Sequence, residues 1–218
     1  MTPQRVAPAL PEGRRAVLYA VRRRGQATVD DVAEQLDMTV SGARQHLTAL
    51  VADGLAEAIE VPRPAGSRGR PQLAYAVTDA ADSLFPKAYG ELTNELLGYL
   101  DESDASLVDT LFERRRDQRV RNATERLAKK RGLKAKVEEL ARILDEDGYL
   151  ATCERHGAGF RVVEHNCAIL SVAQKYGQAC TSEIDFIRTV LPGAGVERVS
   201  HIVDGAHHCA YEITPRAA

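Results

Sequence analysis

The chain contains four cysteines, all after residue 150: Cys153, Cys167, Cys180 and Cys209. Cysteine thiolates ligate zinc and iron–sulfur clusters and take part in redox chemistry. No two of these cysteines have the CxxC spacing of a zinc ribbon or a thioredoxin motif. Ligands from this set would therefore come from separate elements that meet in space. The alternative is a set of buried, inert thiols, because free cysteine is a common core residue.

The elements that must position these cysteines have an α+β pattern. We expect strands at 149–153 and 160–163, helices at 167–176 and 182–190, and a hairpin of strands at 196–203 and 209–213. Cys167 would then lie at a strand-to-helix junction, Cys180 at the end of the following helix and Cys209 at the start of the last strand. Such junctions offer backbone N–H groups and access, which suits a thiolate or a cluster sulfur.

A second kind of chemistry is indicated by residues 28–53. Thr28 and Asp31 have the spacing of a capping box at the start of a short helix. Asp37 and Met38 then form a turn, and Thr39 can cap the next helix. The apolar face of that next helix comprises Val40, Ala43, Leu47, Leu50 and Val51. Two short helices joined by a tight turn are typical of a DNA-binding helix-turn-helix.

The other face of the second helix is polar and able to donate hydrogen bonds. It comprises Ser41, Arg44, Gln45 and Thr48, and Thr39 stands at its start. In the DNA major groove, arginine reads guanine and glutamine reads adenine. We therefore expect Arg44 and Gln45 to contact base edges and Thr39 and Ser41 to contact phosphates. The alternative is an ordinary helix pair with a solvated outer face.

A β-wing is predicted directly after this helix. Strands are expected at 55–61 and 73–77, around a loop rich in proline, glycine and arginine. The loop carries Arg63, Arg68 and Arg70, beside glycines that let the backbone approach phosphates or a narrow minor groove. A first helix at 12–24 completes a winged helix-turn-helix domain, for which we expect the boundaries 12–82 after a loose tail at 1–11.

Three further helices are expected in the middle of the chain. The first, within 83–103, carries an apolar stripe of Tyr89, Leu92, Leu96, Leu97 and Leu100. This stripe could pack on its own domain or on a second subunit. Winged-helix proteins usually bind paired half-sites, so we expect a homodimer with Tyr89, Leu92, Leu96 and Leu100 at or near the subunit contact. The arginine-rich helix at 107–127 is either a solvated face or a second phosphate contact. It opens a C-terminal sensor domain, expected at 104–218, which continues with a helix ending near 144.

Composition limits the partners. The formal net charge of −2 gives no general attraction to nucleic acid, so a DNA-binding surface must be a local patch. No apolar run reaches the length needed to span a membrane, and the first residues lack an apolar signal core. We expect a cytoplasmic protein, in which clustered cysteines favour metal or redox chemistry over a disulfide scaffold.

The segment 164–213 resembles the C-terminal half of the SufR-type transcriptional regulators and their relatives. The similarity extends through the winged helix, the Gly69-Arg70-Pro71 motif and the middle helices. The HNC motif of that family, the cysteine 13 positions later and the cysteine before the last strand fall on Cys167, Cys180 and Cys209. Some members carry another cysteine, whose position is Ala194 here.

This resemblance implies a DNA-binding regulator of the repressor type that is controlled by an iron–sulfur cluster. The cluster, [4Fe-4S] or [2Fe-2S], would be held by Cys167, Cys180 and Cys209. A thiol-redox or zinc sensor on the same scaffold is the first alternative. An iron–sulfur enzyme is the second, although the sequence offers no convergent acid–base set or cofactor-binding loop.

The fourth ligand of such a cluster is not determined by the sequence. Cys153 is favoured because a thiolate is the softest donor that remains. His165 and His201 are alternatives by position, and Glu164 and Glu183 are weaker candidates.

Overall fold

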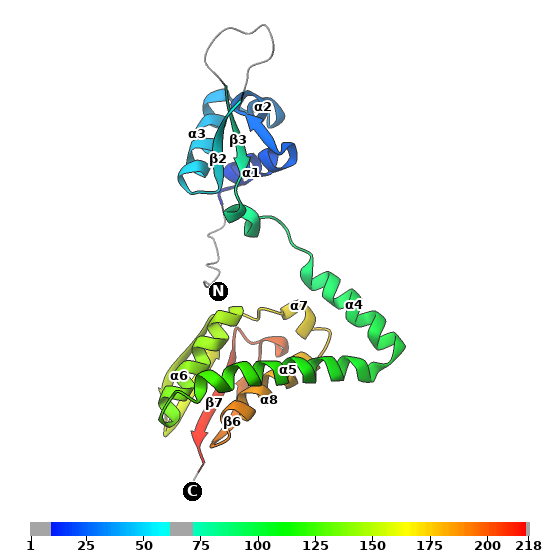
Figure 1. Ribbon diagram of the computed structural model, residues 1–218, viewed down its shortest axis with the longest axis vertical. Helices are drawn as coiled ribbons and strands as arrows, with labels where there is room; N and C mark the ends of the chain where they lie inside the picture. The colour runs from blue at the N-terminus through cyan, green and yellow to red at the C-terminus, as the bar shows by residue number, and fades with distance from the viewer. Residues whose placement is uncertain (1–9, 62–71, 217–218) are drawn as a thin grey trace. The chain divides into compact units, whose positions relative to one another are not determined.

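The computed structural model describes residues 10–61 and 72–216 of the 218-residue chain. The chain divides into two compact units between Lys87 and Ala88 (Figure 1). The architecture is mixed α+β, as predicted, with an antiparallel sheet in each unit. Among the helices of the described ranges, none is both long enough and apolar enough to cross a membrane.

The N-terminal unit is a helix-turn-helix combined with a three-stranded antiparallel sheet in the order β1-β3-β2. Its elements are α1 (Glu12–Arg24), β1 (Gln26–Thr28), α2 (Val29–Gln35), α3 (Val40–Ala52), β2 (Ala56–Val61), β3 (Gln72–Val77) and the 3-10 turn η1 (Asp79–Leu84). Its core includes Leu18, Val32, Leu47, Leu50 and Tyr75. The short strand β1 was not predicted, because three residues are too few to show an alternating pattern.

Local hydrogen bonds determine where α2 and α3 begin. The backbone N–H of Asp31 donates to the Thr28 hydroxyl at 3.2 Å, and the N–H of Thr28 donates to the Asp31 carboxylate at 2.8 Å. This reciprocal pair is the predicted capping box. The Thr39 hydroxyl accepts from the N–H of Gly42 at 3.1 Å and caps α3, also as predicted.

The C-terminal unit contains helices and a four-stranded antiparallel sheet in the order β4-β5-β7-β6. Its helices are α4 (Tyr89–Ser103), α5 (Ala105–Leu127), α6 (Gly132–Leu144), α7 (Leu170–Ala173) and α8 (Gln178–Val190). Its strands are β4 (Ala151–His156), β5 (Gly159–Glu164), β6 (Ala194–Ser200) and β7 (Cys209–Pro215). A single-turn π-helix, η2 (Asp145–Tyr149), follows α6, and a 3-10 turn, η3 (Ile202–Asp204), follows β6.

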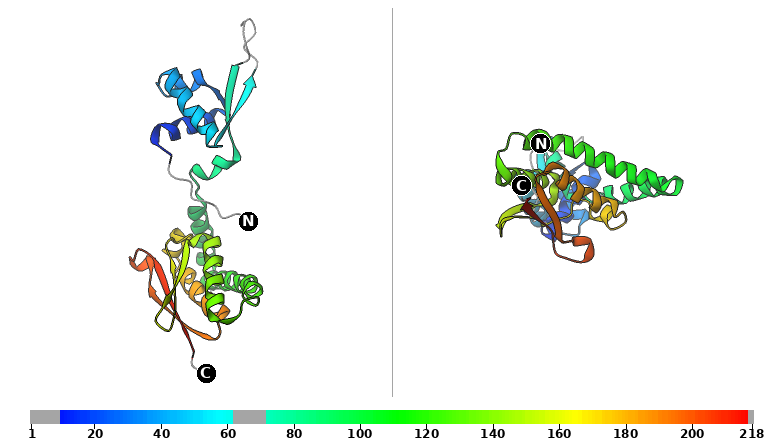
Figure 2. Two further views of the ribbon diagram at one scale, coloured as in Figure 1. Left: turned by 90° about the vertical axis from the view of Figure 1, so that its left-hand side faces the viewer. Right: turned by 90° about the horizontal axis from the view of Figure 1, so that it is seen from below.

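The main core of this unit lies between the sheet and three helices. Figure 2 shows α5, α6 and α8 together on one side of the sheet. The buried contacts include Leu127 of α5, Leu140 of α6, Phe186 of α8 and, from the sheet, Val162 and Ile213. A second, smaller core joins α4 to α5, α7 and α8 through residues such as Leu97, Phe112 and Val172. In this structure α4 is therefore part of the C-terminal unit. The domain boundary expected from the sequence, with the sensor domain beginning at residue 104, stays a prediction.

Two expectations about the C-terminal elements need correction. The helix expected at 167–176 is only the four residues of α7, because the chain turns again around Gly177 before α8 begins. Cys180 therefore lies in the first turn of α8, not at the end of the preceding helix. The strand expected from residue 149 begins at Ala151, because Gly148 (φ 93°) and Leu150 (φ 49°) reverse the chain after α6.

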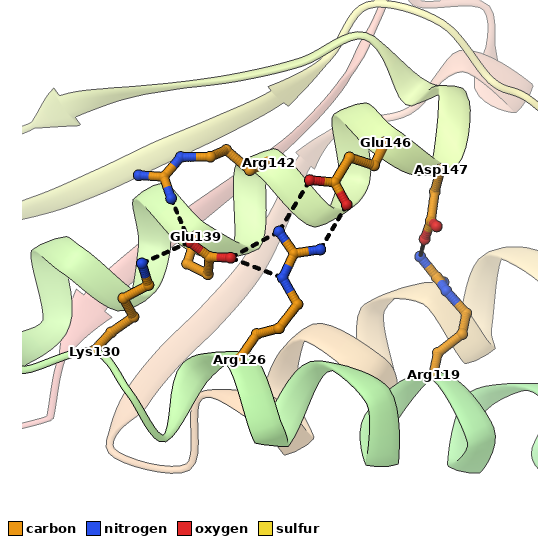
Figure 3. Close-up of polar contacts among 7 residues, drawn as sticks. All are labelled: Arg119, Arg126, Lys130, Glu139, Arg142, Glu146 and Asp147. Carbon is orange, nitrogen blue, oxygen red and sulfur yellow. Dashed lines mark hydrogen bonds and ion pairs between the residues drawn. The ribbon is translucent and has the colours of Figure 1, made fainter. Parts of the chain in front are cut away.

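Acidic partners neutralise part of the arginine-rich face of α5. Glu139 of α6 is 5% exposed and forms ion pairs with Arg126 at 2.7 Å, with Lys130 at 3.0 Å and with Arg142 (Figure 3). Arg126 also binds Glu146 at 2.6 Å. This side of α5 thus stabilises the packing of α5 against α6 and is not a free phosphate-binding surface.

Replacing Glu139 by glutamine tests this network. The variant Glu139→Gln keeps the side-chain shape but leaves cations beside a neutral amide, so we expect the free energy of unfolding to fall by about 1–3 kcal/mol. Urea denaturation of the full chain, followed by circular dichroism, measures this change. Glu138→Gln is the matched control, since the Glu138 side chain is 41% exposed and its one ion pair with a described residue is that with Lys134 at 3.8 Å. Equal losses in both variants would contradict the proposed role of the network.

The same network has a pH signature. Burial acts to raise the pKa of the Glu139 carboxyl, but hydrogen bonds from Lys130 and Arg126 outweigh it and hold that pKa below its usual 4.5. The stabilisation by Glu139 is therefore complete above the pKa that its carboxyl has in the unfolded chain. It is lost as the pH falls through the lower pKa of the same carboxyl in the folded chain. Glu139→Gln should flatten this part of the stability curve at acidic pH.

Candidate functional site

The outer face of α3 has the composition predicted for a DNA-recognition helix. Ala43, Leu47 and Leu50 are fully buried against the N-terminal core, whereas Arg44 and Gln45 are exposed. The remaining predicted contact residues Thr39, Ser41 and Thr48 are also exposed. Val40 was expected on the apolar face, but it is 44% exposed because it occupies the first turn of the helix, beyond the edge of the core.

The polar groups on this face are available for contacts with DNA. Within the described residues, no acidic side chain forms an ion pair with Arg44. The Thr39 hydroxyl uses a lone pair as the helix cap, so its proton can still be donated to a phosphate. The wing residues Arg63, Arg68 and Arg70 lie outside the described residues, and their role remains a prediction.

Three of the four cysteines line one cavity in the C-terminal unit. Cys167 comes from the segment between β5 and α7, Cys180 from α8 and Cys209 from the first position of β7. Cys209 is buried, and its sulfur accepts a hydrogen bond from the N–H of Ile202 at 3.4 Å. Two of the three expected placements, Cys167 at a junction and Cys209 at the start of the last strand, are confirmed.

Polar residues complete the cavity wall. They are Tyr149, Glu164, Glu183, Arg198, His201 and Tyr211. The Tyr211 hydroxyl donates to Glu164 at 3.4 Å, while the Tyr149 hydroxyl donates to Glu183 at 3.2 Å. The sequence did not predict three of these residues: Tyr149, Arg198 and Tyr211. The strand expected at 209–213 could have predicted Tyr211, because alternate side chains of a strand lie on the same face and Tyr211 is two residues from Cys209.

Burial controls the protonation of these groups. It raises the pKa of Glu164 to about 8, with a further contribution from the negative charge of Glu183. Burial also raises the pKa of the Cys209 thiol to about 11 and the pKa values of the Cys167 and Cys180 thiols above their usual 9.0. Without a metal or another electrophile, the three thiols are therefore protonated and poorly reactive at neutral pH.

The structure places Cys153 outside this cavity. Cys153 of β4 pairs with Val162 of β5, which pairs with Tyr211 of β7, so Cys153 is on the correct face of the sheet. However, two strand spacings separate β4 from β7, or about 10 Å. Burial raises the pKa of its thiol, and the charged neighbours that also affect that pKa are Glu138 and Arg142 of α6. Cys153 therefore does not line the cavity with the other three cysteines, and its role as fourth ligand stays a prediction.

The two candidate histidines differ in their surroundings. His165 is exposed, and its Nε2 is 3.0 Å from the Thr152 hydroxyl. His201 lines the cavity, and its side chain is 17% exposed. Only His201 thus shares a site with the three cysteines.

The cavity is narrow, and its ligating groups are spread around it. The centre of a water molecule can occupy a volume of about 20 Å³ inside the cavity. This is room for about one water. Within the described parts of the chain, no three histidine, cysteine or acidic side chains converge closely enough to hold a single metal ion. The donor atoms therefore surround a small space from several sides and do not converge on one point.

Comparison with known proteins supports the assignment of the N-terminal unit. Residues 11–58 match the family model of the bacterial regulatory proteins of the arsR family. The chain is a DNA-binding transcriptional regulator. The match covers α1, α2, α3 and the start of β2, the elements that position the exposed face of α3. No curated protein and no solved structure was found to match the chain.

The role of Arg44 can be tested by separating specific from non-specific binding. Arg44→Ala should cost about 1–3 kcal/mol on the operator and much less on random DNA, because a base contact carries sequence information. Titration of labelled duplexes at fixed salt measures both affinities. Arg23→Ala is the matched control, because it removes the same charge from an exposed position on α1. Equal losses by Arg44→Ala on both duplexes would mean that Arg44 contacts only phosphate.

Proposed function

We propose that this regulator is a homodimeric repressor whose affinity for its operator is controlled by an iron–sulfur cluster held by Cys167, Cys180 and Cys209. The observation that carries the proposal is the lining of one cavity by three thiols from three separate segments. The donor set fits the group, because cysteine thiolates are the usual ligands of iron–sulfur clusters. A bound cluster would supply an oxygen-labile and redox-sensitive link to the iron–sulfur supply of the cell.

Two properties of the cavity favour a cluster over the alternative sensors. A single zinc ion needs three or four donors that converge on one point, whereas the donors to a cluster bind different iron atoms and lie farther apart. A redox-sensing thiol is usually exposed and has a lowered pKa. All three thiols here have a raised pKa because of burial. These properties favour neither the zinc sensor nor the thiol sensor.

The cysteine-bearing segments are packed directly against α4. Cys167 and Cys180 contact the small core that contains Leu97 of α4. The Asn94 amide of α4 donates to the carbonyl of Ser171 at 2.9 Å, and the Tyr176 hydroxyl donates to the carbonyl of Asn94 at 3.4 Å. Because the cavity has room for about one water, filling it requires these segments to move apart. A shift of α7 is therefore transmitted to α4.

A groove beside the cavity gives this movement room. It has a volume of about 400 Å³ and lies between α4, α5 and the segment that follows Cys167. Its apolar walls include Leu97, Leu111, Phe112 and Ile169. Side chains displaced from the cavity can thus repack without exposing a new apolar surface.

The exposed apolar side chains of α4 form the proposed dimer contact, whereas Leu97 and Leu100 of the expected stripe pack in the small core of the same unit. Tyr89 is 70% exposed and Leu96 is 53% exposed, and Leu92 and Tyr99 are also exposed on this helix. Their spacing of three and four residues forms one continuous stripe. A contact here couples the cavity to the separation of the two recognition helices, and so to the affinity for paired half-sites. An enzymatic role is not needed to account for this arrangement.

The cluster site is tested by metal analysis. Protein purified without oxygen should contain iron and acid-labile sulfide and absorb visible light, whereas zinc and thiol sensors are colourless. Each of Cys167→Ser, Cys180→Ser and Cys209→Ser should lose most of the iron, because two thiolates anchor a cluster poorly. Cys153→Ser is the matched control and should retain wild-type iron, sulfide and spectrum. A colourless, iron-free wild type would refute the cluster.

The dimer contact is tested by placing a charge in the stripe. Leu96→Glu should give a folded monomer with weakened operator binding, because a desolvated carboxylate opposes burial at the contact. Analytical ultracentrifugation at micromolar concentration measures the mass, and circular dichroism measures the fold. Val199→Glu changes a comparably exposed apolar residue of β6 and should stay dimeric. A monomeric wild type at that concentration would contradict this contact.

A further inference from the structure

One imidazole nitrogen in the cysteine cavity is buried without a hydrogen-bond partner. His201 follows β6 directly and precedes η3. Its Nε2 atom is inaccessible to solvent and has no partner among the described residues. A buried polar atom normally finds a partner, because desolvation without a hydrogen bond is costly. His201 lines the same cavity as Cys167, Cys180 and Cys209.

The other ring nitrogen is held by a carboxylate. Nδ1 of His201 lies 2.9 Å from the Asp204 carboxylate. This contact favours the tautomer that carries the proton on Nδ1, which leaves the lone pair on Nε2. Metal-ligating histidines almost always donate their second N–H to a carboxylate, a carbonyl or water, which orients the ring. His201 therefore has the second contact expected of a ligand as well as a free donor atom.

The backbone fixes this pair in place. The carbonyl of His201 accepts from the N–H of Asp204 and from that of Ala206, both at 3.2 Å. Gly205 adopts φ 95°, a conformation in the left-handed region that closes the turn. The imidazole and its carboxylate are therefore carried by one closed turn, which joins β6 to the segment before Cys209.

We infer that Nε2 of His201 is the fourth protein ligand of the cluster, beside the thiolates of Cys167, Cys180 and Cys209. This inference rests on the proposed function. Imidazole is an established ligand in place of cysteine in some iron–sulfur centres. A neutral histidine also leaves one negative charge fewer on the site than a fourth thiolate would.

The position that carries a cysteine in some relatives cannot serve this role. Ala194 is at the beginning of β6 and pairs with Pro215, six residues along β7 from Cys209. At about 3.3 Å per residue, this separation is about 20 Å. His201 is at the other end of β6, next to the cavity.

One oxygen of each carboxylate in the cavity is already engaged, and the other has no partner among the described residues. Glu183 accepts from Arg119 at 2.6 Å and from Tyr149, and Glu164 accepts from Tyr211. Both are also harder donors than imidazole, which suits them less to the iron of a cluster. Of the non-sulfur groups in the cavity, His201 thus combines a free donor atom with suitable softness.

Pulsed electron paramagnetic resonance on the reduced, anaerobically reconstituted full chain tests this ligand. Protein grown on ¹⁵N-histidine should show a strong coupling of the cluster spin to one imidazole nitrogen. His201→Cys should keep iron and sulfide at wild-type levels, lose that coupling and shift the reduction potential to more negative values. His165→Ala is the matched control and should keep both the coupling and the potential.

The possible failures are distinct. A cluster without histidine coupling in the wild type, or a coupling that survives in His201→Cys, overturns the assignment of His201 and leaves the proposed function intact. A wild type without iron and sulfide overturns both. His201→Ala covers the case in which the cysteine variant fails to fold: loss of the coupling in a folded, iron-containing His201→Ala supports the assignment, and its persistence refutes it.

Discussion

The pairing of β5 with β7 determines which side chains the C-terminal unit can bring together. Glu164 stands directly opposite Cys209, and Val162 stands opposite Tyr211. Side chains alternate between the two faces of a strand, so this register places all four on the face that the helices cover. A shift by one residue would expose Cys209 and Tyr211 to solvent and place neighbouring residues in the core. The antiparallel register thus separates a polar end of the core, at Glu164 and Cys209, from an apolar end at Ile213.

That polar end exists only because its charges have partners. Arg119 of α5 is paired with Glu183 at 2.6 Å and with Asp147 at 2.8 Å, and its guanidinium lies 4.3 Å from the centre of the Phe186 ring. Removing one member of such a buried pair leaves an uncompensated charge, which is strongly destabilising. Several unpartnered buried atoms belong to residues that line the cavity: one oxygen each of Glu164 and Glu183, Nε of Arg198 and Nε2 of His201. Such residual polarity in a packed core is expected where a protein holds a polar or ionic group.

The sequence predicted local features well and long-range features poorly. The capping box at Thr28 and the cap at Thr39 depend on residues three positions apart, so the composition of a short segment is enough to predict them. The π-helix turn before β4 and the break between α7 and α8 depend on backbone angles that the apolar pattern does not encode. The convergence of Cys167, Cys180 and Cys209 was expected from a resemblance, not from their spacing. The contributions of Tyr149 and Arg198 became visible only with the packing of the helices on the sheet.

The two faces of α4 give a physical basis for communication within the C-terminal unit. One face buries Leu97 against the segments that carry Cys167 and Cys180, while the other exposes an apolar stripe. A helix is stiff over its 15 residues, so a displacement on one face moves the other by a similar amount. Coupling between sites amounts typically to about 1–3 kcal/mol, which is 5–150-fold in affinity. Burial of two apolar side chains such as Leu97 and Phe112 stabilises the core by about 3–6 kcal/mol, more than such a coupling requires, so a shift of α4 can alter the proposed dimer contact without unfolding the core that transmits it.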